Sequence, residues 1–162
     1  MTDQAASGEL REGDPAPEFT ALTDEGTKLS LSDLRGKKVV LYFYPKDDTP
    51  GCTIESCEFR DAHPRFVGKD AVVLGVSPDD VRSHQKFRKK FDLPFTLLVD
   101  EGHAIADRYE TWGEKSLFGV KYHGTLRTTY VIDREGRIAR IFRKVKPKGH
   151  AEEVEQALAQ IP

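Results

Sequence analysis

The chain has 162 residues, with 25 Lys and Arg against 27 Asp and Glu, and its formal net charge is −2. This length suits one domain with one hydrophobic core, and the small charge argues against a nucleic-acid or acidic-lipid surface. No apolar stretch is long enough to span a bilayer, and the polar N-terminus lacks the apolar core of a secretion signal. We therefore expect a cytoplasmic protein that binds neither nucleic acid nor membrane.

The N-terminal part of the chain predicts an arm followed by a small hairpin. Residues 1–12 are polar and acidic, and we expect a flexible arm there, ahead of a single domain over residues 13–162. Residues 18–22 and 27–31 flank a turn-forming segment and predict the two strands of an N-terminal hairpin. Ser32 is expected to cap a short helical turn that follows.

Strand-like and helix-like segments alternate through the rest of the chain. In chain order we expect strand 39–44, helix 53–66, strand 71–77, helix 78–91, strand 95–99, helix 103–109, strands 128–133 and 137–143, and helix 149–160. The first strand reads VVLYFY, an uninterrupted pattern typical of a strand buried on both faces. Alternating elements require parallel strands, and the late hairpin adds antiparallel ones. The predicted fold class is α/β, with a mixed central sheet flanked by helices.

Both cysteines lie just after that first buried strand. Pro50 and Gly51 mark a turn, Cys52 follows at the expected start of a helix, and Cys57 lies five residues further on. Free backbone N–H groups and the helix dipole favour negative charge at a first helical turn, and the thiolate is the nucleophilic form of cysteine. In the cytoplasm, such a pair is more often catalytic or redox-sensing than structural.

The segment YFYPKDDTPGCT, residues 42–53, resembles the active-site segment of a peroxiredoxin of the bacterioferritin-comigratory, or Q-type, subfamily. The resemblance runs from Gly13 to about Ala159. It implies a thioredoxin-like fold and the reduction of hydrogen peroxide and organic hydroperoxides to water and alcohols. It also implies recycling by thioredoxin or a similar dithiol protein and a role in antioxidant defence and redox homeostasis. No metal or other cofactor is expected.

The same resemblance assigns roles to individual residues. Cys52 matches the peroxidatic cysteine, Thr49 the threonine that contacts thiolate and peroxide, and Pro45 the proline that shields the pocket. Arg127 matches the arginine that favours the thiolate and polarises the peroxide, and its charge and planar fork of donors suit that task. Backbone N–H groups around Gly51 and Cys52 can hold a peroxide oxygen as an oxyanion hole does.

Cys57 matches the resolving cysteine that many members of the subfamily carry on the same helix. Five helical residues give a rise of about 7.5 Å and a rotation of about 140°, so the two Cα atoms would lie roughly 8–9 Å apart. A disulfide tolerates at most about 7 Å without backbone movement. We therefore predict that the first helical turns unwind on oxidation. Because both thiols belong to one chain, we expect a monomer.

Less specific interpretations exist for each of these residues. The cysteines could be core residues, or Cys57 could be a spectator while a partner's thiol resolves Cys52. Thr49 could serve as a helix cap, Pro45 as a strand terminator and Arg127 as a solvated charge. Glu55 is ordinarily a favourable helix-dipole or capping residue, and the resemblance suggests that it also orients the arginine.

Three other functions compete with peroxide reduction. A thiol–disulfide oxidoreductase usually carries C-x-x-C, whereas four residues separate the cysteines here. A redox-sensing interaction protein would oxidise once without turnover, and a structural zinc module would need further ligands. The histidines lack ligand-like spacing, and we expect all five on the surface. We expect Tyr109, Trp112 and Phe118 to pack in the core rather than to wall the site.

Overall fold

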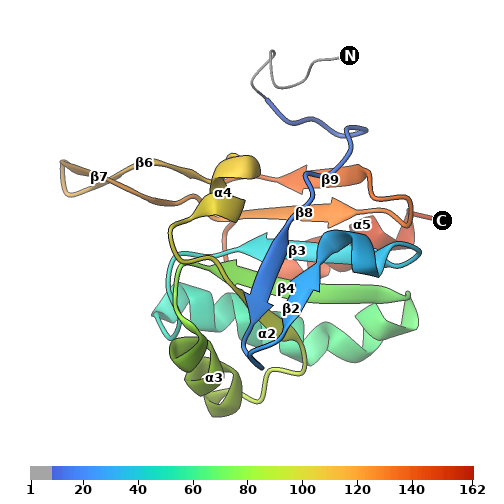
Figure 1. Cartoon of the computed structure of the whole chain (residues 1–162), viewed down its shortest axis with the longest axis horizontal. Helices are drawn as coiled ribbons and strands as arrows, with labels where there is room; N and C mark the ends of the chain where they lie inside the picture. The colour runs from blue at the N-terminus through green and yellow to red at the C-terminus, as the bar shows by residue number, and fades with distance from the viewer. Residues whose placement is uncertain (1–8) are drawn as a thin grey trace.

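A seven-stranded sheet forms the centre of the computed structural model, which describes residues 9–162 (Figure 1). Its strands stand in the order β2-β1-β5-β4-β3-β8-β9. They are β1 (Thr20–Thr23), β2 (Lys28–Ser30), β3 (Lys38–Phe43), β4 (Ala71–Ser77), β5 (Thr96–Val99), β8 (Thr128–Ile132) and β9 (Ile138–Phe142). Strands β3, β4 and β5 are parallel, whereas the β1–β2, β1–β5, β3–β8 and β8–β9 pairs are antiparallel. The predicted mixed sheet is confirmed.

Strand β3 is buried on both of its faces, as its sequence predicts. Val40 and Tyr42 point into one hydrophobic cluster, and Leu41 and Phe43 point into a second cluster on the opposite face. Successive side chains of a strand alternate between faces, so an unbroken apolar run fills both cores at once. Packing on both faces therefore holds β3 in place, and the loop that follows it starts from a fixed position.

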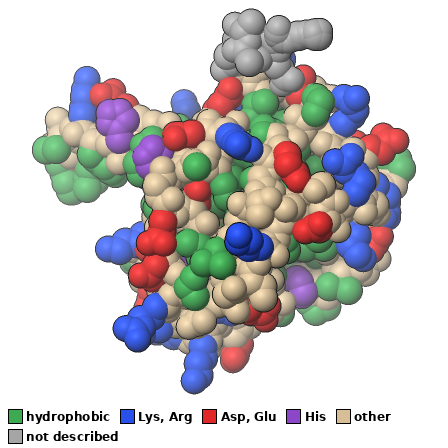
Figure 2. All heavy atoms as spheres, in the orientation of Figure 1, with side chains coloured by type: hydrophobic (Ala, Val, Ile, Leu, Met, Phe, Trp, Pro, Cys, Tyr) green, Lys and Arg blue, Asp and Glu red, His purple; other side chains and the backbone are tan. Residues whose placement is uncertain are grey.

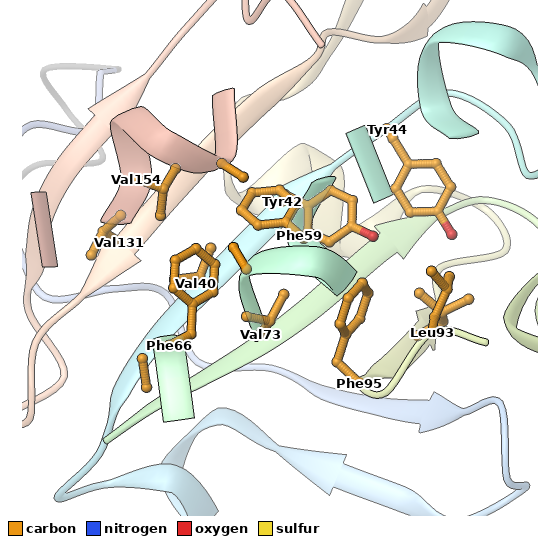
Figure 3. Close-up of a cluster of buried hydrophobic side chains, with 14 of the residues drawn as sticks. Val40, Tyr42, Tyr44, Phe59, Phe66, Val73, Leu93, Phe95, Val131 and Val154 are labelled. Carbon is orange, nitrogen blue, oxygen red and sulfur yellow. The ribbon is translucent and has the colours of Figure 1, made fainter. Parts of the chain in front are cut away.

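Helices cover both faces of the sheet. Helix α2 (Pro50–Gly68), helix α3 (Val81–Lys90) and helix α5 (His150–Ala159) contribute to the first cluster, and the short helix α4 (Ala104–Arg108) contributes to the second. Figure 3 shows the first cluster, in which the rings of Tyr42 and Phe59 lie with centroids 4.8 Å apart. This packing holds α2 against the sheet at Phe59, seven residues after Cys52.

Three helices begin or end at least two residues away from the expected positions. The short 3-10 helix η1 (Leu31–Leu34) is capped by Ser30 rather than Ser32. The Ser30 backbone N–H donates to the Asp33 carboxylate, which completes a capping box. Helix α3 begins three residues late, after Asp80, whose side chain accepts a hydrogen bond from Ser83 N–H. Helix α2 begins at Pro50, three residues before its expected start, and continues through Pro64 to Gly68.

One hairpin was not predicted. Strands β6 (Trp112–Leu117) and β7 (Val120–Thr125) form a separate two-stranded sheet that projects from the body of the molecule (Figure 1). Its tip carries exposed apolar side chains from Leu117, Phe118 and Val120, seen as the green end of the projection in Figure 2. Phe118 is 96% exposed, so its expected place in the core is wrong.

The expected N-terminal arm falls largely on residues 1–8, which lie outside the described residues. Leu10 is buried against the second cluster, and its N–H donates to Glu110 Oε1 at 2.9 Å. The chain is therefore already anchored before residue 12. Across residues 9–162, none of the helices has the length and apolar character that crossing a membrane requires.

Candidate active site

The loop between β3 and α2 places Cys52 in the first turn of the helix. Thr49 is the N-cap residue, with extended backbone (φ −91°, ψ 157°), and Pro50 follows at the first helical position. Proline suits that position because its fixed φ is helical and its missing N–H would have no partner there. The N–H groups of Gly51 and Cys52 belong to the turn that lacks intrahelical acceptors. They are therefore available to an oxygen near the sulfur.

Arg127 connects the sulfur of Cys52 to a buried carboxylate. Its Nη2 lies 3.5 Å from Cys52 Sγ, and its Nη1 donates to Glu55 Oε1 at 2.7 Å. Burial lowers the pKa of Arg127, but the neighbouring Glu55 and Cys52 outweigh burial and raise it. The guanidinium thus stays charged beside the sulfur of Cys52. Cys52 itself has no exposed surface, so a peroxide reaches Sγ only when the covering side chains move apart.

Gly51 lets the arginine approach the start of the helix. A Cβ at this position would lie 3.1 Å from Arg127 Nη2 and 3.4 Å from Pro147 Cγ. The first distance is shorter than ordinary carbon–nitrogen contact, so a larger residue would push the guanidinium away. Close packing rather than backbone conformation favours a small residue here, since the backbone is ordinary helix.

Thr49 and Pro45 lie where the sequence placed them, at the two ends of the loop. Thr49 Oγ1 donates to Lys46 O at 2.8 Å and makes no side-chain cap for the helix. Because a hydroxyl also has lone pairs, the Thr49 oxygen can still accept a hydrogen bond from the O–H of a peroxide. Pro45 is half-buried and follows Tyr44 at the end of the central strand.

Glu55 is fully buried three residues after Cys52. Burial raises the pKa of Glu55 to about 7, although the charge and hydrogen bond of Arg127 pull it down. Its second oxygen, Oε2, has no hydrogen-bond partner among the described residues. Glu55 therefore does more than interact with the helix dipole: one oxygen fixes the guanidinium that faces the sulfur.

Cys57 lies apart from this group, on another face of the same helix. Both cysteines are free thiols, and Cys57 is half-buried. Burial raises the pKa of Cys57, Arg60 lowers it and Asp61 raises it. The helix is continuous from Pro50 to Gly68, so the premise of the unwinding prediction is met. The unwinding itself stays a prediction.

Sequence reasoning missed one charged residue near the site. Lys115 on the unpredicted hairpin donates from Nζ to Thr125 O at 2.8 Å. Burial and Arg127 lower the pKa of Lys115, and Cys52 raises it, which places this lysine in the electrostatic surroundings of the sulfur. The only signal for this hairpin in the sequence was Gly119, which lies in the turn between its two strands.

The expectation that all histidines lie on the surface is wrong for two of them. His84 and His150 have no exposed surface. His84 lies beside Asp47 and Asp79, and one side-chain polar atom from each of the three lies within 4.8 Å of the other two. Hydrogen bonds within this group and to its neighbours already use the atoms that face one another.

Comparison with known proteins places these residues in a family context. Residues 12–141 match the AhpC/TSA family. A putative peroxiredoxin bcp from Coxiella burnetii is 54% identical over 142 residues, which cover 88% of this chain and 94% of that protein. Peroxiredoxin Bcp from Bacillus subtilis is 50% identical over 146 residues, covering 90% and 93%.

Solved structures of similar proteins share the fold. Peroxiredoxin Q from Xanthomonas campestris superposes with a TM-score of 0.83 at 38% identity, covering 87% of this chain and 89% of that one. A cysteine-to-serine mutant of PrxQ from Xylella fastidiosa gives a TM-score of 0.88 at 36% identity, covering 93% and 96%. These similarities confirm the predicted thioredoxin-like α/β fold.

Proposed function

The chain belongs to the AhpC/TSA family as a thiol peroxidase of the peroxiredoxin Bcp and Q type, and we propose that Cys52 is its peroxidatic cysteine. The substrates in this proposal are hydrogen peroxide and organic hydroperoxides. Cys57 resolves the oxidised sulfur within the same chain, and thioredoxin or a similar dithiol protein reduces the product. The observation that carries the proposal is the Arg127 guanidinium, held by Glu55 and placed 3.5 Å from the Cys52 sulfur.

In the first step, the Cys52 thiolate attacks one peroxide oxygen and the O–O bond breaks. The products are a sulfenic acid on Cys52 and an alkoxide or hydroxide, which takes a proton from water. Negative charge grows on the leaving oxygen, and the Arg127 fork can stabilise it together with the N–H groups of the first helical turn. Thr49 offers a hydroxyl that orients the peroxide.

In the second step, the Cys57 thiol condenses with the sulfenic acid, giving a disulfide and water. Burial raises the pKa of Cys57, so this residue carries its proton at neutral pH and supplies it to the departing water. The geometry of a regular helix keeps the two Cα atoms roughly 8–9 Å apart, beyond the reach of a disulfide. The first turns of α2 therefore unwind for the bond to form.

In the third step, a dithiol protein reopens the disulfide. Thiol–disulfide exchange depends on which sulfur is accessible, and Cys57 is half-buried whereas Cys52 is fully buried. We propose that the reductant attacks the Cys57 sulfur. One solved structure of a similar protein, the bacterioferritin comigratory protein of Xanthomonas campestris at 37% identity, concerns the alkyl peroxide reduction activity of that protein. This similarity supports organic hydroperoxides as substrates here.

A turnover assay tests the proposal. With thioredoxin, its reductase and NADPH, the wild-type protein should consume hydrogen peroxide continuously. Cys52→Ser should be inactive, and Cys57→Ser should react once and then stop. A single oxidation of the wild type without turnover would favour a redox sensor instead, and turnover by Cys52→Ser would refute the assignment of the nucleophile. The monomeric state and the cytoplasmic location stay predictions.

A further inference from the structure

A buried carboxylate–imidazole pair lies beneath the loop that carries the active site. His84 of α3 has no exposed surface, and Asp47 of the β3–α2 loop is 7% exposed. His84 Nδ1 lies 2.7 Å from Asp47 Oδ2, and His84 Nε2 lies 2.8 Å from Leu98 O. The histidine thus joins the loop to strand β5, two elements far apart in the sequence.

Both ring nitrogens of His84 face acceptors, which identifies the charge state of the pair. The Leu98 carbonyl can only accept, so Nε2 carries a proton. The Asp47 carboxylate accepts from Tyr44 OH at 2.6 Å and from Ser83 Oγ at 2.8 Å, so both of its oxygens act as acceptors. Nδ1 therefore also carries a proton, and the ring is an imidazolium.

The charges around His84 agree with this reading. Burial lowers the pKa of His84, but the hydrogen bond and charge of Asp47, the Leu98 carbonyl and the charge of Asp79 outweigh burial and raise it. The facing groups from the packed elements are thus two carboxylates, one carbonyl and the Tyr44 hydroxyl. His84 and Asp47 thus form a buried ion pair. Their other hydrogen-bonding atoms also have partners, and these further hydrogen bonds help to offset the cost of burying two charges.

Asp47 in turn holds a strained part of the loop. Its N–H donates to Asp79 Oδ2 at 2.8 Å, and that same oxygen accepts from Ser77 Oγ at 2.6 Å. The next residue, Asp48, has φ 60°, in the left-handed region that a residue other than glycine adopts only when its surroundings require it. Thr49, the proposed peroxide-contacting residue, follows directly.

We propose that His84 is a positioning residue for peroxide reduction: its imidazolium fixes Asp47, and Asp47 holds the strained loop that places Thr49 and the first turn of α2 around Cys52. The inference rests on the proposed function, because it concerns the same site. His84 does not touch the peroxide. It acts through Asp47, so its loss changes where the reacting groups lie rather than which groups are present.

A pH dependence follows because the ion pair exists only while His84 is protonated. The folded state holds the His84 proton more tightly than the unfolded state does, so the anchor is fully present at low pH. It is lost as the pH rises through the raised pKa of folded His84. A neutral ring would leave one nitrogen lone pair facing an acceptor. The loop should therefore loosen, and the peroxide reaction should slow, on the alkaline side.

The first test observes His84 itself in the reduced wild-type protein and in Asp47→Asn. A pH titration of the ring nitrogens by NMR should show both nitrogens protonated at neutral pH, with a pKa above the ordinary 6.5. In Asp47→Asn that pKa should fall. A neutral His84 ring at neutral pH in the wild type would overturn the inference, whatever the activity of the enzyme.

The second test measures oxidation of Cys52 by hydrogen peroxide in a single turnover across pH. His84→Gln, which keeps a donor but has no charge, should react at least about tenfold more slowly at neutral pH, because small misplacements of reacting groups are costly. It should also lack the alkaline decline of the wild type. The matched control is His150→Gln, another fully buried histidine, whose hydrogen bonds go to Thr129 and Glu153.

The outcomes separate this inference from the proposed function. A rate and pH profile of His84→Gln equal to those of the wild type, or an equal loss in His150→Gln, would overturn the role of His84 while peroxide reduction stands. A wild-type protein that does not react with peroxide would refute the proposed function, and the His84 inference would fall with it.

Discussion

Replacing the buried Glu55 by glutamine should change how the stability of the reduced protein depends on pH. Glu55 has no exposed surface, one of its oxygens accepts from Arg127 at 2.7 Å, and the other has no partner among the described residues. Burial raises its pKa from 4.5 to about 7. Ionising the carboxyl inside the protein is therefore costly, even beside the guanidinium.

The size of the effect follows from that rise. At about 1.4 kcal/mol for each pH unit, it corresponds to about 3 kcal/mol. Because the folded pKa is the higher one, this contribution to stability is fully present below pH 4.5 and is lost as the pH rises through about 7. Glutamine cannot ionise, so Glu55→Gln removes the pH dependence. Its amide nitrogen also adds a pH-independent cost of about 1–3 kcal/mol where no acceptor is available.

Urea unfolding of the reduced proteins measures this contribution. From about pH 4.5 to about pH 8, the free energy of unfolding of Glu55→Gln should gain about 3 kcal/mol relative to the wild type. The control Glu152→Gln removes an exposed carboxylate of α5 and should follow the wild type. Parallel curves for the wild type and Glu55→Gln would refute the assignment of a buried carboxyl with a raised pKa.

Further expected outcomes concern the peroxide step and the helix that carries it. Arg127→Lys keeps a charge but loses the fork of donors, and stopped-flow oxidation of Cys52 should slow by roughly 10²–10³-fold; an unchanged rate would exclude the arginine from the reaction. Thr49→Val should slow the same step, whereas Thr49→Ser should retain most of the rate, and equal rates for both would show that the hydroxyl is dispensable. Gly51→Ala should slow oxidation because its Cβ would lie 3.1 Å from Arg127 Nη2; a wild-type rate would show that the guanidinium moves aside freely. Amide hydrogen exchange over residues 50–58 should be faster in the disulfide form than in the reduced form, and equal protection would contradict unwinding of the helix.

The sequence predicted the parts of the fold and site that depend on local chemistry. The run from Val39 to Tyr44 required burial on two faces, and the structure divides it between two clusters. The turn residues before Cys52 predicted a thiol in the first turn of a helix, and the structure has it there, although the helix begins at Pro50 rather than at residue 53. These features need only neighbouring residues to be explained.

The parts that were missed depend on contacts between distant segments. The hairpin from Trp112 to Thr125 is exposed along half of β6 and most of β7, so no apolar alternation marked it. Phe118 and Gly119, both with positive φ, form its turn. The burial of His84 depends on Asp47 and on a carbonyl of another strand, and neither is visible from the polar sequence around the histidine.

Mass spectrometry of the reduced protein after one equivalent of hydroperoxide tests the central claim most directly. We expect the wild type to contain a Cys52–Cys57 disulfide and the Cys57→Ser variant to stop at a sulfenic acid on Cys52. An unmodified Cys52 in both proteins, or oxidation confined to Cys57, would contradict the account.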